Sequence, residues 1–174
     1  MIELKSEKPQ VDVKIHDDYN VDYSIKPLSR GFGITLGNTL RRVLLSSVPG
    51  AAIVNVKIDG VQHEYSTIEG VYEDVMGIVL NLKQIVVNVD SNEPNFEQKL
   101  ELYVEGPTTV TAKDFNKVTG VNIVNPDQVI ATITGDVALQ MEVTVRRGIG
   151  YVSAEENKIF SNNQIGIIPI DSLY

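Results

Sequence analysis

The sequence contains no cysteine in its 174 residues, and histidine occurs only at positions 16 and 63. The absence of cysteine excludes a disulfide framework, a thiolate metal site and a cysteine nucleophile. Two histidines are also too few for the ligand sets that zinc usually takes. We therefore expect His16 and His63 to be structural or exposed, and we expect no metal ion or other cofactor.

Long apolar runs and an excess of positive charge are missing as well. No apolar run approaches the roughly 20 residues of a membrane-spanning helix, and the N-terminal residues MIELKSEK do not resemble a signal sequence. The chain has 15 basic and 23 acidic residues, a net charge of -8, which opposes tight nonspecific binding to DNA. These absences predict a soluble cytoplasmic protein that touches neither a membrane nor DNA directly.

Residues 1–50 carry the pattern of two strands and one amphipathic helix. Alternation predicts strands at 11–15 and 21–25 with a turn at 17–20, and a helix at about 34–48 with Thr35 as N-cap. One helix face carries Leu36, Leu40, Val43, Leu44 and Ser47, whereas Arg41, Arg42 and Leu45 fall toward the other side. So small a unit rarely stands alone, so we expect it to pair with further segments or another chain.

Residues 51–174 carry the pattern of a mostly β region with one packed helix. A strand is predicted at 51–58, with a pairing segment at 61–65. A helix follows, from a capping box at Ser66–Glu69 along an apolar stripe to Lys83. Further strands are predicted at 85–89, 96–104, 121–124, 129–133 and 137–145, with a loop at 147–163 and a final apolar segment at 165–170. The predicted fold class is α+β in two domains.

Catalytic and nucleotide-binding motifs are incomplete. Gly31, Gly33 and Gly37 have a spacing one residue too long for the dinucleotide fingerprint, so a tight turn and close helix packing are favoured. His63-Glu64 begins like a zinc-protease motif, but position 67 is threonine. Ser46-Ser47 lacks the surroundings of a nucleophilic serine. No catalytic or metal-binding residue is therefore predicted.

Two charged groups have both a structural and a functional interpretation. Glu64, Glu69, Glu73 and Asp74 suit acid–base or Mg²⁺ chemistry, but they also suit the start of a helix, where the dipole favours negative charge. Arg146-Arg147 suits a turn with exposed charge. On the predicted first helix, Arg41 and Arg42 beside Leu45 suit a protein contact, because arginine combines a donor fork with an apolar stem.

Several long motifs resemble the alpha subunit of bacterial DNA-directed RNA polymerase. They are RGFGITLGNTLRRVLLSSVPG, VKIDGVQHEYSTIEGVYEDV, NLKQIVV, RRGIGYV and IPIDSLY. The resemblance covers nearly the whole chain and implies a non-catalytic transcription subunit that dimerises and scaffolds the beta and beta-prime subunits. Nucleotidyltransferase chemistry would belong to the larger subunits. Arg146-Arg147 lies in the RRGIGYV motif, so the resemblance leaves open a contact with another subunit beside the exposed turn. The family usually has proline where this chain has Ser153.

The resemblance also implies domains and roles for individual residues. Residues 1–50 would be the first half of the dimerisation domain, and 51–174 the insert domain. The family chain continues past the position of Tyr174 back to the first unit, so this sequence looks truncated, and without that return apolar surface of the first unit would be exposed. Arg41 and Arg42 match the beta-binding determinant, with Leu45 and Lys83 as further candidates. Leu36, Leu40, Val43, Leu44 and Ser47 would form a dimer or core face.

A different class of function remains open from the residues alone. In this alternative, the chain is a small β-rich ligand-binding domain or a minor metal-dependent enzyme that uses the acidic group between Glu69 and Asp74.

Overall fold

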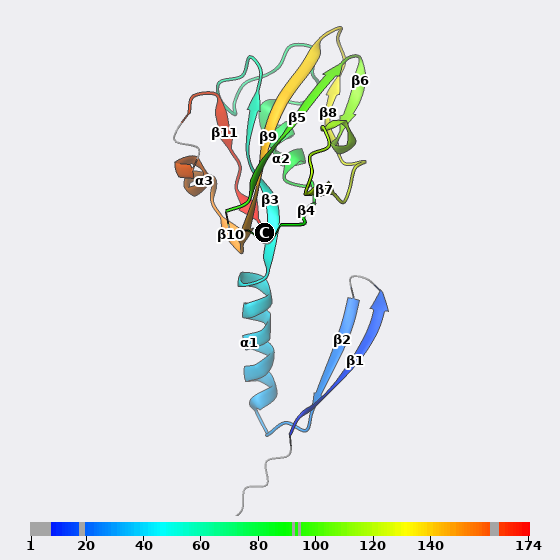
Figure 1. The fold of residues 1–174 in the computed structure, drawn as a ribbon, viewed down its shortest axis with the longest axis vertical. Helices are drawn as coiled ribbons and strands as arrows, with labels where there is room; N and C mark the ends of the chain where they lie inside the picture. Colours follow the sequence, from blue (N-terminus) through cyan, green and yellow to red (C-terminus); the bar gives the residue numbers. More distant parts are fainter. Residues whose placement is uncertain (1–7, 18–19, 92, 94, 161–163) are drawn as a thin grey trace, which may run out of the picture. The chain divides into compact units, whose positions relative to one another are not determined.

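The computed structural model describes residues 8–17, 20–91, 93, 95–160 and 164–174. Figure 1 shows a mixture of helices and strands, which confirms the predicted α+β class. The chain forms two units, Met1–Leu45 (unit 1) and Ser46–Tyr174 (unit 2), and each is described by itself. None of the helices in the described ranges has the length and apolarity needed to cross a membrane.

Unit 1 contains the two predicted strands as an antiparallel hairpin and most of helix α1 (Phe32–Ser46). The strands are β1 (Gln10–Asp17) and β2 (Asn20–Lys26). Their register pairs Val11 with Ile25, Val13 with Tyr23, and Ile15 with Val21. Directly opposite residues share a face, so these six apolar side chains form one side of the hairpin. The predicted turn at 17–20 includes residues 18–19, which lie outside the described residues.

Helix α1 begins earlier than predicted. Gly31 has a φ of 84°, and the Phe32 N–H donates to the carbonyl of Ser29 at 3.0 Å, so the chain turns into the helix at Phe32. Thr35 is therefore inside the helix, where its carbonyl accepts a bond from the Thr39 hydroxyl at 2.8 Å. The prediction of Thr35 as N-cap was wrong because a glycine turn upstream starts the helix.

Unit 2 is built on one large sheet with the strand order β5-β9-β3-β4-β7. These strands are β5 (Glu97–Glu105), β9 (Ala138–Ile149), β3 (Pro49–Ile58), β4 (Val87–Val89) and β7 (Val121–Ile123). Strand β11 (Ile167–Pro169) also pairs with β3. The remaining elements are α2 (Val75–Leu82), α3 (Ala154–Phe160), the 3-10 turn η1 (Ala112–Asp114), and the pairs β6 (Thr108–Thr111) with β8 (Val129–Ile133) and β10 (Tyr151–Val152) with β12 (Ser172–Leu173).

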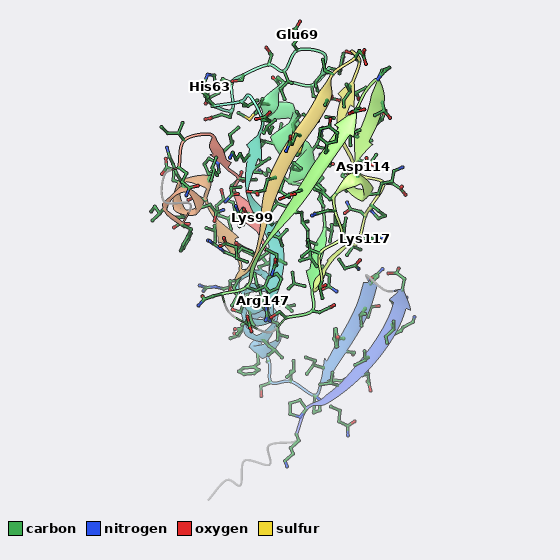
Figure 2. The ribbon with its side chains drawn as sticks, turned by 45° about the horizontal axis from the view of Figure 1, so that its top comes forward. His63, Glu69, Lys99, Asp114, Lys117 and Arg147 are labelled. Atoms are coloured by element: carbon green, nitrogen blue, oxygen red, sulfur yellow. The ribbon has the colours of Figure 1, made fainter. Side chains whose placement is uncertain are left out.

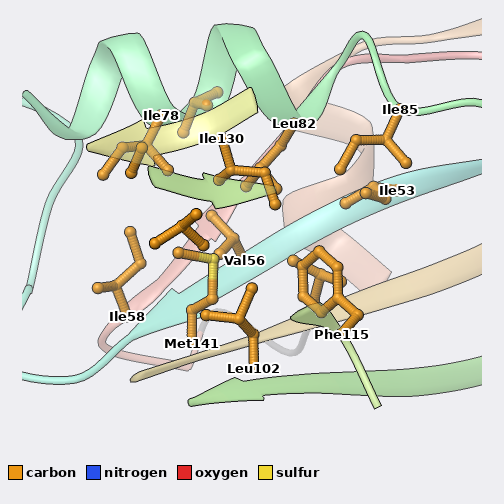
Figure 3. Close-up of a cluster of buried hydrophobic side chains, with 14 of the residues drawn as sticks. Ile53, Val56, Ile58, Ile78, Leu82, Ile85, Leu102, Phe115, Ile130 and Met141 are labelled. Atoms are coloured by element: carbon orange, nitrogen blue, oxygen red, sulfur yellow. The ribbon is translucent and has the colours of Figure 1, made fainter. Parts of the chain in front are cut away.

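The core of unit 2 lies between α2 and the sheet, as Figure 3 shows. Ile78 and Leu82 of α2 are fully buried. The alternation predicted for the long strand is confirmed in β9, where four side chains are at most 2% exposed: Leu139, Met141, Val143 and Val145. Burial of each such side chain contributes about 1.5–3 kcal/mol to folding. This packed core makes unit 2 a rigid support for surface residues.

Helix α2 is shorter than the sequence pattern predicts. Asp74 is its N-cap, since the Asp74 carboxylate accepts the Gly77 N–H at 2.6 Å. The predicted capping box at Ser66–Glu69 is wrong: the Ser66 hydroxyl lies 3.1 Å from His63 Nδ1, and Gly70 has a φ of 78° that interrupts a helix. The segment 61–65 forms no strand either. Helix-start signals occur at two places, and tertiary contacts select the second.

The predicted loop at 147–163 contains regular structure in its described part. Strand β9 continues to Ile149, and β10 and α3 follow. Helix α3 was missed because its buried residue is polar: the Asn157 amide donates to the Ile170 carbonyl at 2.6 Å and to the Ser172 hydroxyl at 3.0 Å. The Ser172 hydroxyl in turn donates to the Ile53 carbonyl at 3.0 Å. This network fastens α3 to the end of unit 2.

Candidate interaction surfaces

Helix α1 exposes both its arginines and its apolar residues. The helix has no buried residue. Arg41 and Arg42 are exposed, and the Leu45 side chain is 69% exposed. Exposed guanidinium groups beside an exposed leucine have the chemistry of a protein contact.

Sequence reasoning missed one member of this surface. Ile34 is 75% exposed, and it precedes Arg41 and Leu45 by seven and eleven residues. Residues at this spacing share one helix stripe. The spacing alone could have identified Ile34, had the helix start been placed before Thr35.

The predicted dimer or core face of α1 is not covered by the described residues of unit 1. Leu36 is half-buried, and the other members, Leu40, Val43, Leu44 and Ser47, are exposed. The apolar side of the β1–β2 hairpin is also open, with Val13 53% and Ile15 73% exposed. Unit 1 therefore presents two unpacked apolar faces, which mark an interaction surface.

A groove of about 540 Å³ lies at the start of β3 in unit 2. Its lining includes Ile53, Leu82, Ile85 and Val87, which are buried, and Val86 and Leu173, which are exposed. Lys83, the C-cap of α2, stands beside it and pairs with Asp171 at 2.7 Å. The predicted candidate Lys83 is thus placed at an apolar groove, together with an aspartate that sequence analysis did not single out.

Tyr174 also lines this groove. Its N–H donates to the Gly150 carbonyl at 2.9 Å. A Cβ at Gly50 would lie 2.8 Å from the Tyr174 backbone, so that position favours glycine, and one at Gly148 would lie 2.5 Å from the Tyr174 ring, which would have to move. Burial raises the pKa of the Tyr174 phenol, although the charge of Arg146 acts in the opposite direction.

The Arg146-Arg147 pair makes contacts inside unit 2. The Arg146 guanidinium pairs with Glu97 and lies 4.6 Å from the centre of the Phe160 ring. The Arg147 guanidinium donates to the Ser91 carbonyl at 2.9 Å. Figure 2 labels Arg147 near the strand ends. These contacts favour a structural role for the pair.

Two of the acidic residues from Glu64 to Asp74 stabilise the fold through side-chain hydrogen bonds. The Glu73 carboxylate accepts bonds from the Thr132 N–H at 2.6 Å and the Thr132 hydroxyl at 3.1 Å. Asp74 caps α2. Glu69 is exposed, and Figure 2 shows it at the tip of a loop. Among the residues that the structure describes, no three His, Asp or Glu side chains are arranged to hold a metal ion.

Replacement of Glu73 by alanine is expected to lower the free energy of unfolding by about 2–3 kcal/mol. The change leaves the half-buried Thr132 N–H without its acceptor. Glu73→Gln keeps an acceptor and should lose only about 1 kcal/mol. Glu69→Ala, on an exposed residue nearby, is the control and should change stability by less than about 0.5 kcal/mol. Urea unfolding followed by circular dichroism measures all three, and equal stability of Glu73→Ala and Glu69→Ala would contradict the assignment.

Gly31, Gly33 and Gly37 lie in the turn before α1 and in the first half of that helix. Gly31 supplies the positive φ for the turn. A Cβ on Gly33 or Gly37 would meet no atom within 4 Å. The two helical glycines therefore face open space instead of the close packing predicted for them.

The sequence of this chain matches a protein family and several known proteins. Residues 56–174 match the family described as RNA polymerase Rpb3/RpoA insert domain. A DNA-directed RNA polymerase subunit alpha from Aster yellows witches'-broom phytoplasma is 60% identical over 87% of this chain and 46% of its own length. The subunits of the same name from Alkaliphilus metalliredigens and Beutenbergia cavernae are 49% and 47% identical, over 100% and 98% of this chain and 54% and 49% of their own lengths.

The chain thus spans about half the length of the curated relatives it matches. The family match covers most of unit 2, and the relatives from Alkaliphilus and Beutenbergia also cover unit 1. The chain therefore belongs to the RNA polymerase Rpb3/RpoA insert domain family, and its predicted resemblance to the bacterial RNA polymerase alpha subunit is confirmed.

Proposed function

We propose that this chain acts in transcription as a non-catalytic assembly part of a DNA-directed RNA polymerase alpha subunit. It pairs with a second alpha subunit, docks the beta and beta-prime subunits, and contributes no group to phosphodiester chemistry. It works in the cytoplasm and does not bind DNA directly. The relatives' names support the polymerase assignment, and the net charge of -8 supports the absence of DNA binding.

The observation that carries this proposal is the exposed surface of α1. A helix with no buried residue gains little stability from its own chain, and its apolar side chains remain in water. Such a helix becomes stable when a partner covers it. Arg41 and Arg42 then donate hydrogen bonds to carboxylate or carbonyl groups of the beta subunit. Leu45 lies between the two arginines on the helix surface and fills an apolar site of the beta subunit. The opposite face, with Leu40 and Leu44, packs against the second alpha subunit.

Co-purification tests the proposal. The chain carries an affinity tag and is co-expressed with the beta subunit of the Aster yellows phytoplasma, whose alpha subunit is 60% identical. We expect the beta subunit to remain bound through washing in moderate salt. Complete loss of the beta subunit from a folded, tagged chain would contradict the proposed function.

The groove beside Lys83 is expected to contribute to beta binding. Lys83→Ala should weaken capture of the beta subunit about tenfold, the effect of losing one charge-assisted contact. The Lys83–Asp171 pair is about one-third exposed at both side chains, so its loss should change the free energy of unfolding by less than about 1 kcal/mol. Lys99→Ala, which breaks a similar pair with Glu142, is the matched control. An equal loss of capture in both variants would exclude a specific role for Lys83.

A further inference from the structure

The two edges of the large sheet meet at a second pocket of about 420 Å³, here called the seam pocket. Leu100 comes from β5 at one edge of the sheet, and Val121 and Ile123 come from β7 at the other edge. The segment 112–117, which also lines the pocket, is bonded to β5: the Asn116 N–H donates to the Glu101 carbonyl at 2.8 Å, and the Glu101 N–H donates to Asn116 Oδ1 at 2.8 Å. The pocket is therefore lined by residues of both edge strands of the sheet.

The seam pocket has an apolar floor and a basic rim. Leu100, Ala112 and Phe115 are buried and form the floor. Lys113 and Lys117 line the pocket and are exposed. A partly apolar hollow of this size with a few polar groups at its edge has the composition of a ligand site.

The described residues that line the seam pocket include two lysines and neither an aspartate nor a glutamate. Asp114 is not among these lining residues, and its carboxylate accepts bonds from the Thr111 N–H at 2.8 Å and the Thr111 hydroxyl at 3.1 Å. The Glu101 side chain lines a different pocket with Lys57 and Gln140. Figure 2 shows Asp114 and Lys117 on the same flank of unit 2. The two ammonium groups in the lining of the pocket favour a negatively charged partner.

Strand β7 offers backbone groups at the same place. Asn122 lies opposite Asn88 of β4, the Val124 N–H donates to the Val86 carbonyl at 2.9 Å, and the Asp90 N–H donates to the Gly120 carbonyl at 3.1 Å. Backbone groups alternate between the two edges of a strand, so the N–H and C=O of Ile123 and the C=O of Val121 point away from β4. An extended peptide can pair with such an edge.

We propose that the seam pocket binds an extended, acidic segment of a partner protein. An apolar side chain of that segment lies on the floor, its carboxylates lie beside Lys113 and Lys117, and its main chain pairs with the free edge of β7. Two lysines on an acidic chain are too few for tight binding of nucleic acid. The seam pocket shares no residue with α1 or with the groove beside Lys83, so it is tested independently of the proposed function.

The test titrates the full 174-residue chain into a fluorescein-labelled hexapeptide, Glu-Glu-Phe-Glu-Ile-Glu, and follows binding by the fluorescence of the peptide. NMR follows the amide shifts of the chain when the peptide is added. We expect saturable binding that weakens with salt and shifts confined to residues 112–126 and neighbouring β4 and β5. The double variant Lys113→Gln/Lys117→Gln should bind at least about tenfold more weakly, and a peptide with serine in place of Phe and Ile should lose about as much. Both lysines are exposed, so the variant should fold normally.

The control is Lys57→Gln/Lys99→Gln, which removes the same charge from other exposed positions of unit 2 and should change binding less than about twofold. If no saturable binding occurs up to about 1 mM peptide, a concentration at which even weak complexes form, the proposal is overturned. Equal loss in the two double variants, or equal binding of oligothymidine or of a peptide with lysine in place of glutamate, would overturn it as well.

Discussion

Replacement of Arg41 and Arg42 together by alanine is expected to weaken binding of the beta subunit by about a hundredfold. Hydrogen bonds to charged groups contribute about 1.5–3 kcal/mol each, so the loss of two of them, partly offset by water, corresponds to about this factor. The measurement is quantitative capture of the beta subunit by the tagged chain across a concentration series. Because α1 has no buried residue, the substitutions should leave the fold of the chain unchanged by circular dichroism.

Lys14→Ala/Lys26→Ala is the matched control for this experiment. Both lysines are exposed in the same unit, on the polar side of the β1–β2 hairpin. Their loss removes the same charge without touching α1, and should change capture by less than about threefold, as expected of nonspecific electrostatics. Undiminished capture by the arginine variant would contradict the assignment of Arg41 and Arg42.

Substitution of glutamate for Leu40 and Leu44 is expected to abolish self-association of the chain. These side chains are 44% and 66% exposed on the proposed dimer face of α1. Burial of each leucine in an interface contributes about 1.5–3 kcal/mol, and a buried unpaired carboxylate opposes association further, so the dissociation constant should rise more than a hundredfold. Sedimentation equilibrium should show oligomers for the unsubstituted chain and monomers for the variant.

Leu80→Glu/Val124→Glu tests whether any loss of apolar surface has the same effect. Both side chains are 52% exposed and both belong to unit 2. We expect this variant to associate as the unsubstituted chain does. A monomeric unsubstituted chain, or equal loss of association in the two variants, would show that the α1 face is no dimer surface.

Hydrophobic periodicity predicted strands correctly where one face of the strand is buried. The alternating run in β9 was read correctly because its inward side chains are large and apolar, with polar or charged neighbours between them. The strands β1 and β2 were also predicted from alternation, although their side chains remain largely exposed. Hydrophobic spacing therefore identified these strands but could not show whether a partner within the chain covers them.

Local helix signals were less reliable. Ser66-x-x-Glu69 satisfies the rule for a helix start, yet Gly70 and the contact between Ser66 and His63 hold that segment in a loop. Asp74 caps the helix instead. The capping rule identifies positions where a helix can start, and contacts with the rest of the chain decide which position is used. Here Tyr72 and Glu73, directly before the cap, are bonded to Thr132 of β8.

The sequence by itself determined the α+β class, most strands, the helix that carries Arg41 and Arg42, and the family, because these depend on local periodicity or on long motifs. Only the tertiary structure decided that Lys83 meets Asp171, that Glu73 holds Thr132, and that Leu100 and Ile123 line one pocket. Those pairs are separated by 23 to 88 residues, and no short-range pattern encodes them. They exist because the sheet orders its strands differently from the chain, which brings distant side chains together.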